Sequence, residues 1–126
     1  MAKQKVVLVD TDILIKVFRG DEVKEKILRK IGDGIAISSI TAIELSTGVQ
    51  SKRGMVALKE QLTAYKIYEV SSEISQRARL LALRYNISYN LFAADALIAA
   101  TALELNLPLM TDNNRDFDFI EGLVFY

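Results

Sequence analysis

The feature that most constrains the fold is a long apolar stretch, residues 92–103, with the sequence FAADALIAATAL. It contains no Gly or Pro, and nearly all of its residues are Ala, Leu, Ile or Phe. This composition is typical of a helix that has little preference for water on any side. Its one charged residue is Asp95. An ionised carboxylate in such surroundings is costly unless a cationic side chain, backbone N–H groups or a metal ion compensates its charge.

Short apolar runs that predict buried strands alternate along the chain with helical patterns. The strand candidates are residues 6–9, 35–37, 67–70, 107–110 and 123–125, and the helical patterns cover about 12–18, 22–31, 40–49, 54–65, 72–86 and 91–105. This alternation predicts an α/β fold, a three-layer α/β/α sandwich with a mainly parallel central sheet. With 126 residues and no linker or repeat, residues 1–126 are expected to form a single domain.

Polar residues mark several of the expected helix ends. Asp21 and Ser72 are candidates to cap the second and fifth helices, because short polar side chains accept hydrogen bonds from the first free N–H groups. Asn86 and Asn106 are candidate helix stops, because Asn tolerates the left-handed conformation in which many helices end.

The composition excludes several kinds of chemistry. The chain has no Cys, which excludes disulfides and thiolate sites, and no His, which excludes histidine bases and most zinc sites. Its formal net charge is zero, so long-range attraction to nucleic acid or anionic lipid is not a property of the whole molecule. Lys3 and Lys5 precede an apolar stretch that acidic residues interrupt, and no signal peptide is expected. The expected location is the cytosol.

Acidic residues follow several of the predicted strands. Asp10 and Asp12 come directly after the first strand, and residues 111–116 follow a later one. Glu44 lies just over a turn into the helix after residues 35–38, and Asp95 lies in the first turns of the apolar helix. Sites in parallel sheets form beyond the carboxyl ends of the strands, so these groups can converge. Clustered carboxylates without His or Cys favour Mg²⁺ or Mn²⁺, which serve phosphodiester chemistry by activating water and neutralising charge.

Each acidic residue also has a purely structural explanation. Asp10 or Asp12 could cap the helix at 12–18, and Glu44 could close a capping box with Thr41. Asp95 could pair with a buried Arg. Turn formation alone would account for three others: Asp112, Asn113 and Asp116. No single structural role covers all four segments, which favours a shared site.

Four segments resemble the motifs of a known family. They read VLVDTDILI at 7–15, ISSITAIEL at 37–45, DALIAATAL at 95–103 and LMTDNNRDF at 109–117. In this order and spacing they resemble PIN-domain proteins, specifically the VapC-type toxins of type II toxin–antitoxin systems. The resemblance covers nearly the whole chain. It implies a PIN-like fold and a Mg²⁺-dependent endoribonuclease, with Mn²⁺ as an alternative ion.

The resemblance also implies roles for individual residues. By motif position, Asp10, Glu44 and Asp95 match the family's acidic trio. Asp10 and Asp95 are expected to bind the metal directly, and Glu44 to bind the metal or orient the attacking water. The fourth acidic position falls on Asn113, an uncharged and weaker ligand, so either Asp116 or Asp112 could complete the site, or the site could hold one metal ion; Asp116 is taken as the further catalytic candidate. The auxiliary candidates are Thr11, Asp12, Thr111, Asp112 and Asn113, among which the two threonines match hydroxyl positions that orient carboxylates or a metal water.

The implied partners are an RNA substrate, a small antitoxin whose C-terminal segment covers the site, and a second copy of the chain. The homodimer is also suggested by the apolar residues of helices 12–18 and 22–31, some of which exceed what one core uses. Basic candidates for RNA contacts are Lys16, Arg19, Lys52, Arg53 and Arg115, and stacking candidates are Tyr85, Tyr89 and Phe92. The apolar stretch at 92–103 is too short to span a bilayer, so no membrane association is expected.

Two other functions fit part of the pattern. A haloacid-dehalogenase-like phosphatase also opens with an apolar strand and Asp-x-Asp, with Asp10 as nucleophile and Asp12 as acid/base. Ile13 stands where such enzymes usually carry Gly, and this function leaves Glu44 and Asp95 unexplained. The second alternative is a catalytically decayed PIN-fold binding module, for which Asn113 would be the sign of decay.

Overall fold

A four-stranded parallel sheet forms the centre of the structure, a computed structural model that describes residues 5–126. The strands are β1 (Val7–Val9), β2 (Ile35–Ser38), β3 (Lys66–Tyr68) and β4 (Leu109–Met110), and their order across the sheet is β3-β2-β1-β4. All three pairings are parallel, as the sequence predicted. The chain moves outward from β1 through β2 to β3 and then returns to place β4 on the other side of β1.

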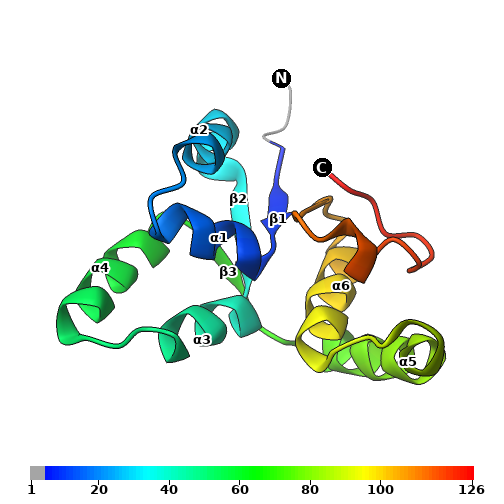
Figure 1. Cartoon of the computed structure of the whole chain (residues 1–126). Helices are drawn as coiled ribbons and strands as arrows, with labels where there is room; N and C mark the ends of the chain where they lie inside the picture. The colour runs from blue at the N-terminus through cyan, green and yellow to red at the C-terminus, as the bar shows by residue number, and fades with distance from the viewer. Residues whose placement is uncertain (1–4) are drawn as a thin grey trace.

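Helices cover both faces of this sheet, which confirms the three-layer arrangement (Figure 1). The helices are α1 (Thr11–Phe18), α2 (Glu22–Ile31), α3 (Ser39–Thr47), α4 (Lys52–Leu62), α5 (Ser72–Tyr89) and α6 (Ala93–Leu105). Figure 1 shows α1 to α4 on one side of the sheet and α5 with α6 on the other. Two short 3₁₀ helices, η1 (Gly32–Gly34) and η2 (Asn114–Asp116), complete the set.

The two faces have separate apolar cores because successive strand residues point in opposite directions. Val7 and Val9 pack with the α1 to α4 layer, whereas Leu8 between them packs with α5 and α6. The middle of α6 is buried, as its composition predicted, but its first turn is open to solvent at Ala93. Asp95 lies in that first turn and is only partly buried.

Two of the expected helix ends are confirmed and two are displaced. Asp21 caps α2 by accepting from the Lys24 backbone N–H at 3.0 Å, and Asn106 ends α6 in the left-handed region with φ 53°. The cap of α5 is Ser71 instead of Ser72, because its hydroxyl accepts from the backbone of Ile74.

The prediction that Asn86 ends the fifth helix is wrong. Helix α5 continues to Tyr89, and Asn90 ends it with φ 55°. Two Asn residues near the end of this helix tolerate the left-handed conformation, and sequence reasoning chose the earlier one.

The predicted strand at 123–125 is reduced to one bridge, between Phe125 and Leu109. The Leu109 N–H donates to Val124 and the Tyr126 N–H donates back to Leu109, so the C-terminal segment lies along the edge of β4. Strand β4 begins only after Pro108, which lacks the N–H that a ladder would use.

The apolar residues that suggested an association surface on α1 and α2 mostly belong to the core. Ile13, Leu14 and Leu28 are buried, whereas Phe18 and Val23 remain 41% and 67% exposed. The homodimer stays a prediction with less support from this surface. No helix in residues 5–126 is long and apolar enough to cross a membrane.

Candidate functional site

The candidate site lies where β1 and β4 end side by side. Strand order reverses at this pair, and in open parallel sheets such a point leaves a crevice beyond the carboxyl ends of the strands. The Asp10 N–H donates to the carbonyl of Met110 at 2.9 Å, so Asp10 and Thr111 leave the sheet together. Two segments that lie about a hundred residues apart in sequence therefore meet here.

Asp10 is a carboxylate with both oxygens held in place. It is 5% exposed and caps α1, with one oxygen accepting from the Thr11 N–H and the other from the Thr111 hydroxyl, both at 2.8 Å. Burial, and after it the nearby charge of Asp12, raise the pKa of Asp10 to about 7, although the hydrogen bonds from Thr111 and Thr11 act to lower it. The capping explanation of Asp10 is thus correct, and the same side chain faces the site.

Glu44 is positioned by a chain of two threonine hydroxyls. The Thr11 hydroxyl lies 2.8 Å from the Glu44 carboxylate and 2.9 Å from the fully buried Thr41 hydroxyl. A carboxylate only accepts, so Thr11 donates to Glu44 and Thr41 donates to Thr11. The capping-box explanation of Glu44 is wrong: Ser38 caps α3, and Glu44 is bonded across the sheet edge instead.

Asp95 faces other carboxylates without a compensating cation. Burial, and after it the charges of Asp116, Glu44 and Asp12, together raise the pKa of Asp95 to about 6. Within residues 5–126 no hydrogen bond or ion pair reaches its carboxylate, so the buried-Arg explanation finds no support there. All four acidic segments are represented in this one electrostatic environment.

Asp12 anchors the loop that follows β4. One Asp12 oxygen accepts from the Ile13 N–H at 2.8 Å. The other accepts from the backbone N–H of Asp112 at 3.2 Å and from the side-chain amide of Asn113 at 2.9 Å. Asn113 therefore acts as a hydrogen-bond donor to Asp12. The family resemblance led us to expect an aspartate at this position, and an ionised aspartate has no proton to donate.

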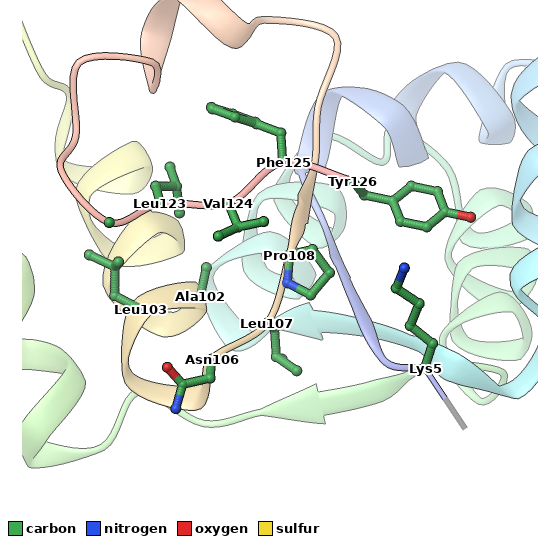
Figure 2. Close-up of a pocket in the computed structure, with 11 residues that line it drawn as sticks. Lys5, Ala102, Leu103, Asn106, Leu107, Pro108, Leu123, Val124, Phe125 and Tyr126 are labelled. Atoms are coloured by element: carbon green, nitrogen blue, oxygen red, sulfur yellow. The ribbon is translucent and has the colours of Figure 1, made fainter. Parts of the chain in front are cut away.

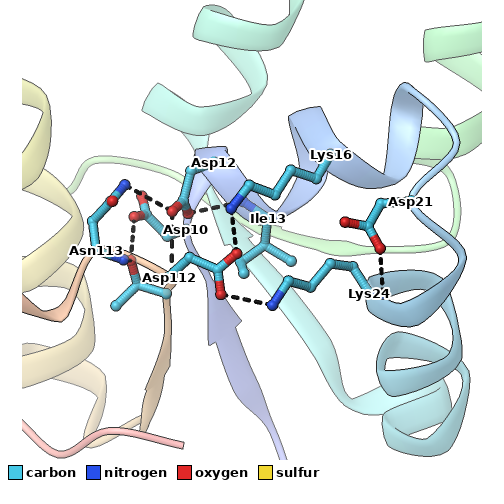
Figure 3. Close-up of polar contacts among 9 residues, drawn as sticks. Asp10, Asp12, Ile13, Lys16, Asp21, Lys24, Asp112 and Asn113 are labelled. Carbon is cyan, nitrogen blue, oxygen red and sulfur yellow. Dashed lines mark hydrogen bonds and ion pairs between the residues drawn. The ribbon is translucent and has the colours of Figure 1, made fainter.

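Asp112 points away from the other carboxylates and toward two lysines (Figure 3). Its oxygens accept from the ammonium groups of Lys16 at 2.5 Å and Lys24 at 2.7 Å. Burial acts to raise the pKa of Asp112, but the two lysines outweigh it and hold the pKa below its ordinary value. Sequence reasoning missed Lys24, because nothing local links it to a loop 88 residues away.

The site has the donors that a hard divalent cation requires, although they are not gathered around one point. All the candidate ligands are oxygens, which suit Mg²⁺ or Mn²⁺, and two of the carboxyls have raised pKa values. The prediction that their oxygens stand ready to share one ion is not met: within residues 5–126 no group of three acidic side chains is arranged to hold a metal. The like charges repel, and separate hydrogen bonds hold Asp10, Asp12 and Glu44.

A cavity lies away from this site (Figure 2). It has a volume of about 540 Å³ and lies between the end of α6 and the C-terminal segment, near the amino ends of β1 and β4. Leu103, Leu107 and Val124 give it an apolar lining, and Lys5 and Asn106 add polar groups. It has no acidic side chain, so it does not share the chemistry of the carboxylate site.

Comparisons with known proteins agree on one family. The family model described as the PIN domain matches residues 7–123. Ribonuclease VapC19 from Mycobacterium tuberculosis is 32% identical over 120 residues, covering 92% of this chain and 95% of the relative. Ribonuclease VapC1 from Methanocaldococcus jannaschii is 32% identical over 130 residues, covering 98% of this chain and 89% of the relative.

Solved structures show the same fold. A chain in a toxin–antitoxin complex from Klebsiella pneumoniae has a TM-score of 0.80 and 33% identity, with 94% of this chain and 95% of that chain covered. DNA-bound VapBC from Salmonella typhimurium contains a chain with a TM-score of 0.86, 18% identity and 97% coverage of both chains, which shows likeness of fold alone. The family resemblance of the four sequence motifs is thus confirmed, and the chain belongs to the PIN-domain family as a relative of the VapC proteins.

Proposed function

We propose that the protein is a metal-dependent endoribonuclease and the toxin of a toxin–antitoxin pair. The observation that carries the proposal is the environment of Asp95, whose carboxyl is influenced by Asp116, Glu44 and Asp12 and meets no cation among residues 5–126. Carboxylates collected in this way call for a bound counter-ion. Relatives that are 32% identical over most of their length are named ribonucleases, which supports RNA as the substrate.

Asp10, Glu44, Asp95 and Asp116 are the residues that would hold the ion. When bound there, Mg²⁺ or Mn²⁺ supplies activation of water and neutralisation of phosphate charge. Asp112 is a poor ligand candidate because two lysines already occupy its oxygens, which favours Asp116 as the fourth acidic group.

The remaining site residues position the carboxylates. The hydroxyl of Thr111 and the backbone N–H of Thr11 orient Asp10, and the Thr11 hydroxyl orients Glu44. Glu44 is exposed, and Thr11 engages one of its oxygens; among residues 5–126 no donor reaches the other oxygen, which could accept a proton or orient a water molecule. Asp12 and Asn113 hold the loop after β4 against the start of α1.

The phosphatase alternative is less well supported by the site. A nucleophilic Asp10 would have to attack with one of its carboxylate oxygens. Both Asp10 oxygens accept hydrogen bonds that would have to be rearranged during attack. That function, moreover, assigns no role to Asp95 or Glu44.

An antitoxin is the protein partner that we propose. The related Klebsiella pneumoniae structure is a toxin–antitoxin complex. In this chain a cavity of about 490 Å³ runs beside Glu44, with Ile15, Phe18, Leu45 and Val49 in its lining. An apolar segment of an antitoxin placed there would come close to the carboxylate site and cover it.

The test is cleavage of a pooled RNA substrate with Mg²⁺, with Mn²⁺, with EDTA and with the variant Asp95→Asn. Cleavage is expected with either metal and should be lost in EDTA. Asp95→Asn removes the charge of one ligand, which should cost on the order of a few kcal/mol of transition-state stabilisation and lower the cleavage rate at least a hundredfold. The products should carry 5′-phosphate and 3′-hydroxyl ends.

Asp33→Asn is the matched control, because Asp33 is exposed in η1 at the opposite edge of the sheet. It makes the same charge change and should cleave as well as the parent protein. Full activity in EDTA, or an unimpaired Asp95→Asn, would contradict the mechanism. Absence of cleavage on every RNA pool with both metals would support the decayed binding module.

A further inference from the structure

The Asp112 carboxylate sits between two ammonium groups from two different helices. Lys16 comes from α1 and Lys24 from α2, and each contacts a different oxygen of the same carboxylate (Figure 3). The lysine side chains are 45% and 22% exposed, so both contacts lie at the surface and remain accessible. The Asp112 backbone meanwhile donates to Asp12, which keeps this group beside the candidate metal ligands.

This arrangement has the form of a phosphate-binding site with an internal anion in it. A phosphodiester also offers two non-bridging oxygens that share one negative charge, and each can take one ammonium group. Lys16 and Lys24 each have three N–H donors and contribute one to Asp112. Asp12 and Asp21 also act on Lys16, so the two lysines are cationic groups in acidic surroundings, and Asp112 is the anion that they contact directly.

The position of the two lysines gives them a use in the proposed reaction. The carboxylates at this edge repel an approaching RNA backbone, and a net charge of zero provides no long-range attraction. The hydrogen bond to Asp112 raises the pKa of Lys16, and the charge of Asp12 acts in the same direction.

We propose that Lys16 and Lys24 bind a backbone phosphate that flanks the scissile phosphate of RNA, and that Asp112 fills this position until the RNA arrives. The inference rests on the proposed ribonuclease function for its substrate. Asp112 then acts as a competitor: it keeps the lysines in place and must yield its ion pairs when a phosphate binds. Removing the lysines should weaken RNA binding, and removing the Asp112 charge should strengthen it.

The experiment measures binding of short single-stranded RNA of mixed sequence by fluorescence anisotropy in EDTA, where no cleavage occurs. Lys16→Ala/Lys24→Ala should weaken binding on the order of tenfold and flatten the dependence of log Kd on log salt by about 0.7 to 1. Asp112→Asn should tighten binding about threefold at low salt, since a competing charge is removed.

Matched controls separate a phosphate subsite from a general charge effect. Lys30 lies on α2 near the start of β1, away from the site, so Lys30→Ala should change binding far less than Lys24→Ala alone. Asp33→Asn removes the same charge as Asp112→Asn, but Asp33 lies in η1, at the amino end of β2. This control should not tighten RNA binding to the same extent. A melting temperature for each variant identifies any that fail to fold, and Lys24→Arg, which keeps the charge, should retain binding.

Two results would overturn the inference: the lysine variants bind RNA no worse than Lys30→Ala, or Asp112→Asn binds no better than Asp33→Asn. The same measurements distinguish failure of this inference from failure of the proposed ribonuclease function. If RNA binding depends on Lys16 and Lys24 but no metal supports cleavage, the subsite stands and the nuclease does not. If the parent protein cleaves RNA while the variants bind like their controls, the nuclease stands and the subsite does not.

Discussion

At the scale of single residues, the site combines local structural roles with an unfavourable electrostatic environment. Asp10 caps a helix and accepts two hydrogen bonds, yet burial and the charge of Asp12 raise its pKa to about 7. Burial is also the main cause that raises the pKa of Asp95 to about 6, and the charges of its acidic neighbours act in the same direction. Ionising either group therefore costs folding free energy that a bound cation would offset.

This cost predicts a pH dependence of stability in metal-free protein. The folded state keeps a proton on Asp10 from its ordinary pKa of 3.8 up to about 7, whereas the unfolded state has released it. Stability must therefore fall as pH rises through this window, by an amount on the order of 2 to 4 kcal/mol for Asp10. Urea denaturation at several pH values in EDTA measures the slope.

Two controls identify the source of that slope. Asp10→Asn should flatten it, because Asn still caps the helix but does not titrate. Saturating Mg²⁺ should also flatten it by stabilising the ionised carboxylates. Stability that rises from pH 5 to pH 8 in EDTA would contradict the assignment.

The hydroxyl chain behind Glu44 leads to a second residue-scale prediction. Thr11→Val keeps the shape but leaves the buried Thr41 hydroxyl without its acceptor and Glu44 without its donor. The expected loss of stability is about 1 to 3 kcal/mol, together with weaker metal binding. Thermal unfolding and Mn²⁺ titration measure the two effects. Thr11→Ser, which keeps the hydroxyl, should recover most of both, and no recovery would show that packing alone is responsible.

At the scale of elements, the site depends on how β1 is set against its neighbours. The turn from α2 into β2 passes Gly34 directly beside the start of β1. A Cβ on Gly34 would lie 2.0 Å from the Lys5 carbonyl oxygen, which belongs to the backbone and cannot rotate away. Glycine at this position thus permits the close approach of these segments.

Gly34→Ala is therefore expected to destabilise the fold by more than 2 kcal/mol, through a shift of the β1–β2 pairing. Thermal unfolding by circular dichroism measures it. Gly48→Ala is the control, because its added Cβ would meet its nearest neighbour at 3.5 Å, an ordinary contact, in the right-handed helical region. Equal melting temperatures for the two variants would contradict the close-approach argument.

At the scale of the whole molecule, the fold brings four sequence-distant segments together beyond the carboxyl ends of β1 and β4. The formal net charge is zero, so repulsion between copies is weak. Among the apolar residues of α1 and α2 that suggested association, Phe18 and Val23 stay exposed. The homodimer remains a prediction that rests chiefly on family resemblance.

Light scattering without an antitoxin should give a mass near twice 14.1 kDa at micromolar concentration. Val23→Lys places a charge on the exposed face of α2 and should lower that mass if this face takes part. A mass of one chain throughout the concentration range would contradict the dimer.

Much of the fold was predictable because its signals are local. The apolar run at β1, the cap at Asp21 and the composition of α6 depend on neighbouring residues and on periodicities of two and 3.6. Strand β4 and the end of α5 were less predictable, because Pro108 and a choice between two Asn residues decide them within a few positions.

The features of the site also divide into those that local sequence predicts and those that depend on distant contacts. The sequence determined which carboxylates follow strands, and parallel topology implied that Asp10, Glu44 and Asp95 share an edge. Only the tertiary structure decided their partners: Thr11 for Glu44, Asn113 for Asp12, and Lys16 with Lys24 for Asp112. These contacts join residues 33 to 101 positions apart. Side chains find such partners only after the helices have packed on the sheet, because packing brings together groups that no local pattern relates.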